Sequence, residues 1–236
     1  MILASLTLAQ LSIALIPVLI VLIIMWHWGL KVGHALHALA RMLLQLLLIG
    51  YALIFIFQAE ASPLVLGVLA VMLLASSWIA LNTVEPSQRR ALFTASLLAI
   101  LLGGGLTLAL ITQGVLQLDP WYEPRYMIPL AGMIFANSMT GISLAADRLQ
   151  AELKNGRSPD QASLTAFQTA MIPVINSLFA VGLVSLPGMM TGQILSGVSP
   201  FIAARYQIMV MCMIFGSAGI STALFLYWSQ RRHQGD

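Results

Sequence analysis

Charged residues are scarce in this chain of 236 residues. Only 8% of them are Asp, Glu, Lys or Arg, whereas 59% are hydrophobic and the mean hydropathy is +0.92. Soluble domains carry about 25% charged residues, so the composition excludes a soluble globular protein. A membrane-crossing helix takes about 20 residues, which leaves room for six to eight spans. We predict an all-α, multi-pass integral membrane protein with one transmembrane domain over residues 1–236.

Cysteine is nearly absent, and so is a nucleotide-binding motif. Cys212 is the single cysteine, which excludes a disulfide framework and a thiolate metal cluster. Leucine precedes both lysines, Lys31 and Lys154, so the Gly-Lys-Ser/Thr ending of a phosphate-binding loop is missing. We therefore predict that the chain is not an enzyme and binds no cofactor itself. If transport is driven by ATP, a separate ATPase must use the ATP and Mg.

Seven apolar segments are long enough to cross a membrane. Placing the N-terminus outside and the C-terminus in the cytoplasm puts nine basic residues inside and two, Arg125 and Arg205, outside. This bias follows the positive-inside rule, so we predict that orientation in the inner (plasma) membrane. It also explains the net charge of +3 without nucleic acid. The segments run roughly over 7–28, 35–57, 62–82, 91–112, 126–146, 181–198 and 204–229.

No acidic residue falls inside these seven segments. All eight carboxylates are predicted to lie in connections or at the chain ends. Carriers coupled to protons or sodium usually keep a carboxylate within the membrane. The pattern argues against a secondary carrier, and against a hydrolase with paired carboxylates. It favours energy supplied from outside the bilayer.

A polar stripe enters the second segment. Lys31, His34, His37, Arg41 and Gln45 follow one another at spacings of three or four, so they share one helical face. Arg41 and Gln45 lie deepest and are predicted to face protein or a water-filled cavity. The two histidines have a spacing that suits a metal, but no third ligand follows. The identity of any metal site is therefore left open.

Methionines mark two later segments. Met133 and Asn137 stand four residues apart and share a helical face, and Met189 and Met190 are adjacent. Thioethers favour soft ions, which suggests a substrate path. The alternative is that these methionines only fill gaps between helices. The predicted path consists of Met133, Asn137, Met189, Met190, Arg41 and Gln45.

The stretch VGLVSLPGMMTG, residues 181–192, predicts a distorted backbone. Pro187 removes a backbone donor and disfavours regular helix before it. Gly188 and Gly192 have the small-xxx-small spacing that lets two membrane helices approach closely. We predict a bend and a close helix contact at these three residues.

Four stretches resemble the FetB-type permeases, the membrane subunits of ABC transporters linked to iron export, whose plant relatives are linked to aluminium tolerance. The resemblance implies two copies of this chain with two cytoplasmic ATPase subunits, exporting iron or a related metal from the cytoplasm. The stretches are RMLLQLLLIGY (41–51), IPLAGMIFANSM (128–139), GRSPDQA (156–162) and VGLVSLPGMMTGQILSGVSPFIAARYQIMV (181–210).

Residues 147–180 are predicted to form a cytoplasmic or interfacial coupling segment with short helices that dock on the ATPase. Ser158 is placed as a helix N-cap, Pro159 at the first helical position, and Gln161 completes a capping box. We expect 164–180 to lie along the inner interface. An ordinary capped loop is the alternative. The residues predicted to couple to the ATPase are Gly156, Ser158, Pro159, Gln161 and Ala162.

Two other functions remain open at this stage. The first is an ABC exporter of an organic or lipid-like solute, because the methionine path offers no hard-metal site. The second is a membrane scaffold or sensor that transports nothing. A stable complex with an ATPase whose turnover responds to cargo would separate a transporter from a scaffold.

Overall fold

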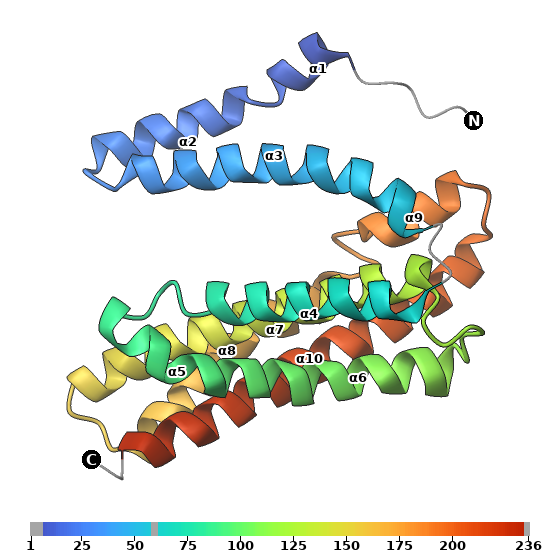
Figure 1. Ribbon diagram of the computed structural model, residues 1–236. Helices are drawn as coiled ribbons and strands as arrows, with labels where there is room; N and C mark the ends of the chain where they lie inside the picture. The colour runs from blue at the N-terminus through green and yellow to red at the C-terminus, as the bar shows by residue number, and fades with distance from the viewer. Residues whose placement is uncertain (1–6, 58–60, 234–236) are drawn as a thin grey trace. The chain divides into compact units, whose positions relative to one another are not determined.

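The computed structural model describes residues 7–57 and 61–233. These residues form ten α-helices and two π-helical stretches, η1 and η2, and no strand (Figure 1). The elements are α1 (Leu8–Ile13), α2 (Ile16–His27), α3 (Val32–Ile56), α4 (Ser62–Ile79), α5 (Pro86–Ala99), η1 (Ile100–Gly105), α6 (Leu106–Ala109), η2 (Leu110–Val115), α7 (Pro124–Lys154), α8 (Pro159–Ala180), α9 (Gly188–Leu195) and α10 (Pro200–His233).

The contacts divide the chain into two units, Met1–Gln58 and Ala59–Asp236. Each unit makes its contacts mainly within itself. In the first unit, α2 and α3 form a helical hairpin. Gly29 turns the chain between them with a φ of +70°, a conformation that suits a residue without a Cβ.

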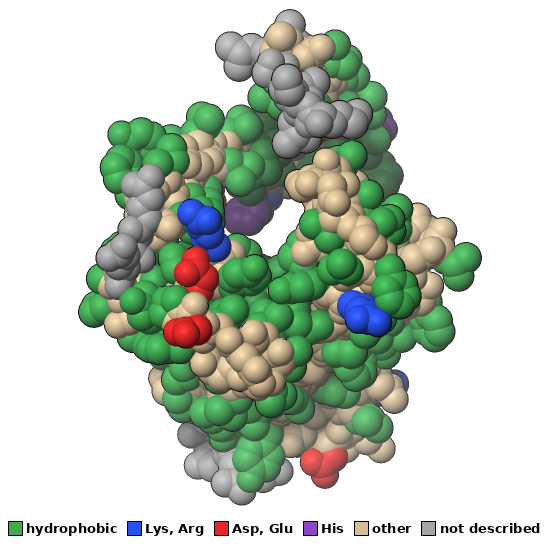
Figure 2. Space-filling model, turned by 90° about the vertical axis from the view of Figure 1, so that its right-hand side faces the viewer, with side chains coloured by type: hydrophobic (Ala, Val, Ile, Leu, Met, Phe, Trp, Pro, Cys, Tyr) green, Lys and Arg blue, Asp and Glu red, His purple; other side chains and the backbone are tan. Residues whose placement is uncertain are grey.

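The second unit is a helical bundle with α7 at its centre. Helix α7 packs against α4, α8 and α10, and α10 also contacts α5 and η1 (Figure 1). Hydrophobic side chains cover most of the face drawn in Figure 2, and the charged ones are few. This surface suits a bundle surrounded by lipid rather than by water.

Seven helical segments are long and apolar enough to cross a membrane, which confirms the predicted all-α polytopic fold and the number of spans. The segments are Gln10–His27, Val32–Ile56, Ser62–Ile79, Pro86–Val115, Pro124–Lys154, Pro159–Ala180 and Pro200–Gln230.

The sixth span is not the one that the sequence predicted. It is α8, Pro159–Ala180, whereas 181–198 contains only a turn and the short helix α9. Helix α8 packs against α7 and α10, and its positions Ala162, Ala166 and Ala170 are at most 1% exposed. Small side chains every four residues let helices approach closely, so packing holds α8 in the bundle although it is among the least hydrophobic of the spans.

The prediction of short coupling helices within 147–180 is therefore wrong, because these residues belong to two long helices and the turn between them. Residues 147–154 continue α7, and a turn of four residues, 155–158, leads directly into α8. The 31 residues of α7 extend over about 46 Å at 1.5 Å per residue, which exceeds the roughly 30 Å of a hydrocarbon core. The last turns of α7 carry Asp147 and Glu152, so these carboxylates lie on a helix and not in a loop.

Close contacts of small residues join α7, α10 and η1 at the middle of the bundle. The Ser221 hydroxyl donates to Ser138 Oγ at 3.1 Å, and Ser138 Oγ donates to the Ser217 carbonyl at 3.3 Å. A Cβ on Gly103 would lie 2.5 Å from Ser221 Oγ, and one on Gly141 would lie 2.5 Å from Thr222 Oγ1. A larger residue does not fit at Gly103, where the added Cβ would also lie 2.7 Å from the Ser221 backbone nitrogen, whereas at Gly141 the close atom belongs to a side chain.

Candidate functional site

The bend predicted at Pro187 is a turn between two helices. Helix α8 ends at Ala180, whose carbonyl accepts hydrogen bonds from the backbone N–H groups of Val184 (2.8 Å) and Ser185 (3.1 Å). Gly182 has a φ of +83°, and Pro187 is the N-cap residue of α9. The turn therefore leads the chain back from the end of α8 into α9.

Gly188 and Gly192 lie on α9 without a close neighbour. A Cβ built on either glycine would meet no atom within 4 Å. Their four-residue spacing thus marks no helix contact within the described part of the chain, which differs from the predicted packing. The sequence pattern alone could not show this, because the same spacing occurs at exposed and at packed positions.

A cavity of about 350 Å³ lies among α7, α8, α9 and α10, at the end of the bundle where α7 and α10 begin. It brings together three residues of the predicted path from two distant segments: Met133 and Asn137 of α7 and Met189 of α9. Pro187 and Gly188 form another part of the wall. The side chains with donor atoms on its lining include Met133, Asn137, Ser177, Met189, Gln207 and Met211.

A second cavity of about 340 Å³ lies beside the first and shares Val181, Gln207 and Met211 with it. Met190 lines this second cavity together with Cys212. Met190, the residue after Met189 on α9, therefore lines a different cavity from Met189. Figure 1 shows α9 as the short helix just before α10.

Arg41 and Gln45 belong to the first unit, on α3. The cavities lie wholly in the second unit. The place of these two residues in a substrate path stays a prediction.

Gln207 is the polar residue that both cavities share. Its side chain is 5% exposed, and its Oε1 is buried without a hydrogen-bond partner. Asn137 donates its amide N–H to the Met133 carbonyl at 2.8 Å, which leaves the carbonyl oxygen as the group it can offer to a ligand. The hydroxyl of Ser177 likewise donates to the Val174 carbonyl at 2.7 Å and presents its oxygen lone pairs.

Sequence reasoning missed Ser177, Gln207 and Met211. A signal was present, since Gln207 is a polar residue in a long apolar run and stands four residues before Met211, so both share a face of α10. What the sequence did not supply was the contact between α10 and the α8–α9 turn. That contact depends on α8 being the sixth span.

The cavities contain no acidic or histidine side chain. Over the residues that the structure describes, no group of three or more His, Cys, Asp or Glu is placed to hold a metal ion. A cation in the first cavity would be bound by thioether sulfurs and neutral oxygens, whereas the second cavity adds the sulfur of Cys212.

The opposite end of the bundle carries the predicted coupling residues. Gly156, in the turn 155–158, has a φ of +79°, and Ser158 is the N-cap of α8 with Pro159 beginning the helix. The capping box is wrong in one respect, because the Ser158 side chain makes no cap hydrogen bond. Gln161 is exposed, whereas Ala162 is fully buried and faces the bundle.

A buried carboxylate holds this turn. Glu152 is 3% exposed and forms ion pairs with Arg148 of α7 and with Arg157 of the turn, the latter at 2.8 Å. Nearby, Lys154 bonds to Glu85 at 2.8 Å and joins α7 to the start of α5. The hydrogen bond from Lys154, together with its positive charge, lowers the pKa of Glu85 below its usual 4.5.

Helix α10 is hydrogen-bonded to the first turn of α8, directly after the turn 155–158. The Gln230 amide donates to the Pro159 carbonyl at 2.9 Å and to Ser163 Oγ at 2.6 Å. Because Gln230 lies on the helix that also lines both cavities, α10 connects the two ends of the bundle.

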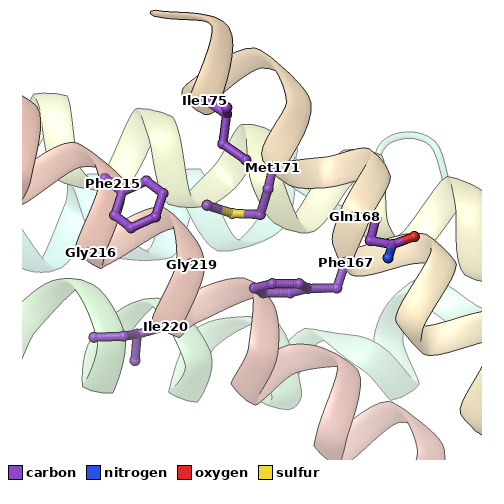
Figure 3. Close-up of a pocket in the computed structure, with 8 residues that line it drawn as sticks. All are labelled: Phe167, Gln168, Met171, Ile175, Phe215, Gly216, Gly219 and Ile220. Atoms are coloured by element: carbon purple, nitrogen blue, oxygen red, sulfur yellow. The ribbon is translucent and has the colours of Figure 1, made fainter. Parts of the chain in front are cut away.

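A larger cavity, of about 490 Å³, opens between α8 and α10 further along the bundle. Figure 3 shows Met171 and Phe167 of α8 facing Phe215 and the two glycines of α10. Gln168 supplies the one polar side chain of its lining. Such an apolar groove suits contact with hydrocarbon and offers few groups that could fix a polar ligand.

Comparison with known proteins shows to which family the chain belongs. The profile of "Uncharacterised protein family (UPF0014)" matches residues 8–233. The chain is 33% identical to "Probable iron export permease protein FetB" of Escherichia coli, over 97% of this chain and 92% of that protein. It is 36% identical to "Protein ALUMINUM SENSITIVE 3" of Arabidopsis thaliana, over 91% of this chain and 84% of that protein.

A further relative is "UPF0014 membrane protein slr1647" of Synechocystis, which is 34% identical over 85% of this chain and 83% of its own length. No solved structure is significantly similar to the chain. The similarity to these relatives extends over both units and over both ends of the bundle.

Proposed function

Because this chain belongs to the UPF0014 family of membrane proteins, we propose that it is the permease subunit of an ABC transporter that exports iron or a related metal from the cytoplasm. The observation that carries the proposal is the likeness to the E. coli iron export permease over almost the full length of both proteins. The relative's name supplies the cargo and the direction.

A separate ATPase is the second part of the proposal. The chain has no phosphate-binding loop, so the energy must come from a partner that uses ATP and Mg. The turn 155–158 offers a docking site, since it is exposed yet held by Glu152 and Gln230. A rigid contact is needed to transmit ATPase closure to the helices.

Orientation and assembly complete the proposal. With the N-terminus outside, the turn 155–158 faces the cytoplasm and the cavity around Gln207 faces the outer half of the membrane, as an exporter requires. The basic residues support this orientation. Two copies of the chain would pair with two ATPase subunits in the inner membrane.

The test is reconstitution of the chain with its cognate ATPase in liposomes. ATP hydrolysis and metal movement are measured together across ferrous, ferric and other metal ions. We expect iron to stimulate hydrolysis and to move only when ATP is present, with an ATPase-inactive partner as the control. A stable complex whose turnover ignores every metal would remove the metal cargo from the proposal.

A second candidate cargo is an organic or lipid-like solute. The absence of carboxylates from the two cavities favours it, because a bare metal ion gains most from charged ligands. Stimulation of the same ATPase by organic extracts, and by no metal, would support this cargo.

A further inference from the structure

The first cavity, of about 350 Å³, has Gln207 in its lining, and we call it the Gln207 chamber. We propose that this chamber binds soft cations of low charge through thioether sulfurs and amide oxygens. Iron would enter it as ferrous rather than ferric ion, and a monovalent soft cation such as Ag+ would bind more tightly still. The inference rests on the proposed function for its metal cargo and names the chemical form of that cargo.

The first argument is the state of Gln207. Its Oε1 is buried and accepts no hydrogen bond, although the side chain is 5% exposed and lies on the wall of both cavities. A buried acceptor without a partner costs free energy in the empty protein. A bound cation, or a water held by that cation, would supply the missing partner.

The second argument is the set of donors around it. Met133, Met189 and Met211 bring three thioether sulfurs to one cavity, from three different helices. Thioethers select soft ions such as cuprous ion, whereas amide and hydroxyl oxygens also accept harder divalent ions. Because the donors are thioether sulfurs together with amide and hydroxyl oxygens, the affinity should rise with the softness of the cation. Ferrous ion is then bound less tightly than a soft monovalent ion.

The third argument is charge. Every donor in the chamber is neutral, and no acidic side chain lines it. The free energy needed to take an ion out of water rises with the square of its charge. For ferric ion it is therefore about nine-fourths of the value for ferrous ion. Without a carboxylate, nothing in the chamber offsets that difference.

The volume fits an ion that keeps part of its water. The first cavity measures about 350 Å³, and one water takes about 30 Å³ in the liquid. The space therefore holds a cation with several waters. Such an ion can bind to one or two protein donors at a time and leave again, as transport requires.

Calorimetry on the purified full-length chain, without its ATPase, tests the inference. The protein carries Cys212→Ser, because Cys212 lines the second cavity and its thiol would bind Ag+ by itself. The ligands are Ag+, ferrous ion under anaerobic conditions, and ferric ion. We expect Ag+ to bind at least tenfold more tightly than ferrous ion, and ferric ion to show no binding in the chamber.

Variants locate the binding. Met189→Leu with Met133→Leu should weaken Ag+ at least tenfold, and Gln207→Leu should weaken ferrous ion by a similar factor. Met171→Leu is the matched control, because Met171 lies in the apolar groove of Figure 3 and outside the chamber. Thermal unfolding of each variant confirms that it is folded.

Two results would overturn the inference: ferric ion binding as tightly as Ag+, or cation binding that survives the chamber variants unchanged. Because the assay needs no ATPase, its outcome is independent of the export assay. A chamber that binds soft cations in a chain that exports no metal would count against the proposed function alone.

Discussion

Gly103 of η1 lies directly against Ser221 of α10. A Cβ added to the glycine would be 2.5 Å from Ser221 Oγ and 2.7 Å from its backbone nitrogen. Backbone atoms cannot move away as a side-chain tip can. This contact, with the Ser221–Ser138 hydrogen bond beside it, determines how closely the fourth, fifth and seventh spans pack.

We expect Gly103→Ala to destabilise the protein by about 1–3 kcal/mol, as overpacking does in other cores. Gly105 is the matched control on the same π-helical stretch, because its added Cβ would meet only Leu101 Cδ1 at 3.7 Å. Gly105→Ala should be neutral or stabilise by up to about 1 kcal/mol, since alanine favours helix over glycine. Thermal unfolding in detergent measures both, and equal losses of stability would contradict the contact.

Met189→Leu and Met190→Leu should differ in transport. Both changes keep the volume within the range that cores tolerate, at a cost below about 1.5 kcal/mol. Met189 shares its cavity with Met133 and Asn137, whereas Met190 lines the neighbouring one. We expect metal efflux from proteoliposomes to fall several-fold in Met189→Leu and less in Met190→Leu. If both variants export normally, the methionines only fill space.

Glu152→Gln should loosen the turn 155–158. The change leaves Arg148 and Arg157 without the buried carboxylate that holds them, at a cost of about 1–3 kcal/mol. We expect ATP hydrolysis by the reconstituted complex to continue while efflux per ATP declines. Glu85→Gln is the control, because its pair with Lys154 is exposed and such pairs contribute little. An equal effect of the two changes would argue against a special role of the turn.

Cysteine labelling tests which segment is the sixth span. In a Cys212→Ser background, Val184→Cys lies in the α8–α9 turn, where Val184 is 84% exposed, and Ser158→Cys lies at the start of α8. We expect a membrane-impermeant maleimide to label position 184 in intact cells and position 158 only after permeabilisation. Labelling of 184 only from the inside would restore 181–198 as the span.

The sixth span was assigned to the wrong segment by hydropathy. Hydropathy favoured 181–198 because Pro173, Asn176 and Ser177 lower the apolar character of the segment before it. In the structure Pro173 lies within α8, and the Ser177 hydroxyl donates a hydrogen bond to the Val174 carbonyl. The proline and the serine that argued against a span are thus both accommodated within the helix.

The candidate site was predicted in part. Met133, Asn137 and Met189 were identified from spacing and composition, and the structure brings them to one cavity. Gln207 was not identified, although its place in an apolar run four residues before Met211 was a signal. Its importance comes from a missing hydrogen bond, which exists only once the helices are packed.

The sequence by itself determined the membrane class and the seven spans, because hydrophobicity is a property of local composition and the bilayer requires it of every spanning helix. The tertiary structure decided which segment forms the sixth span and where the chamber lies. The physical reason is packing: the alanines of α8 and the glycines of η1 and α7 gain their effect only from the helices against which they lie.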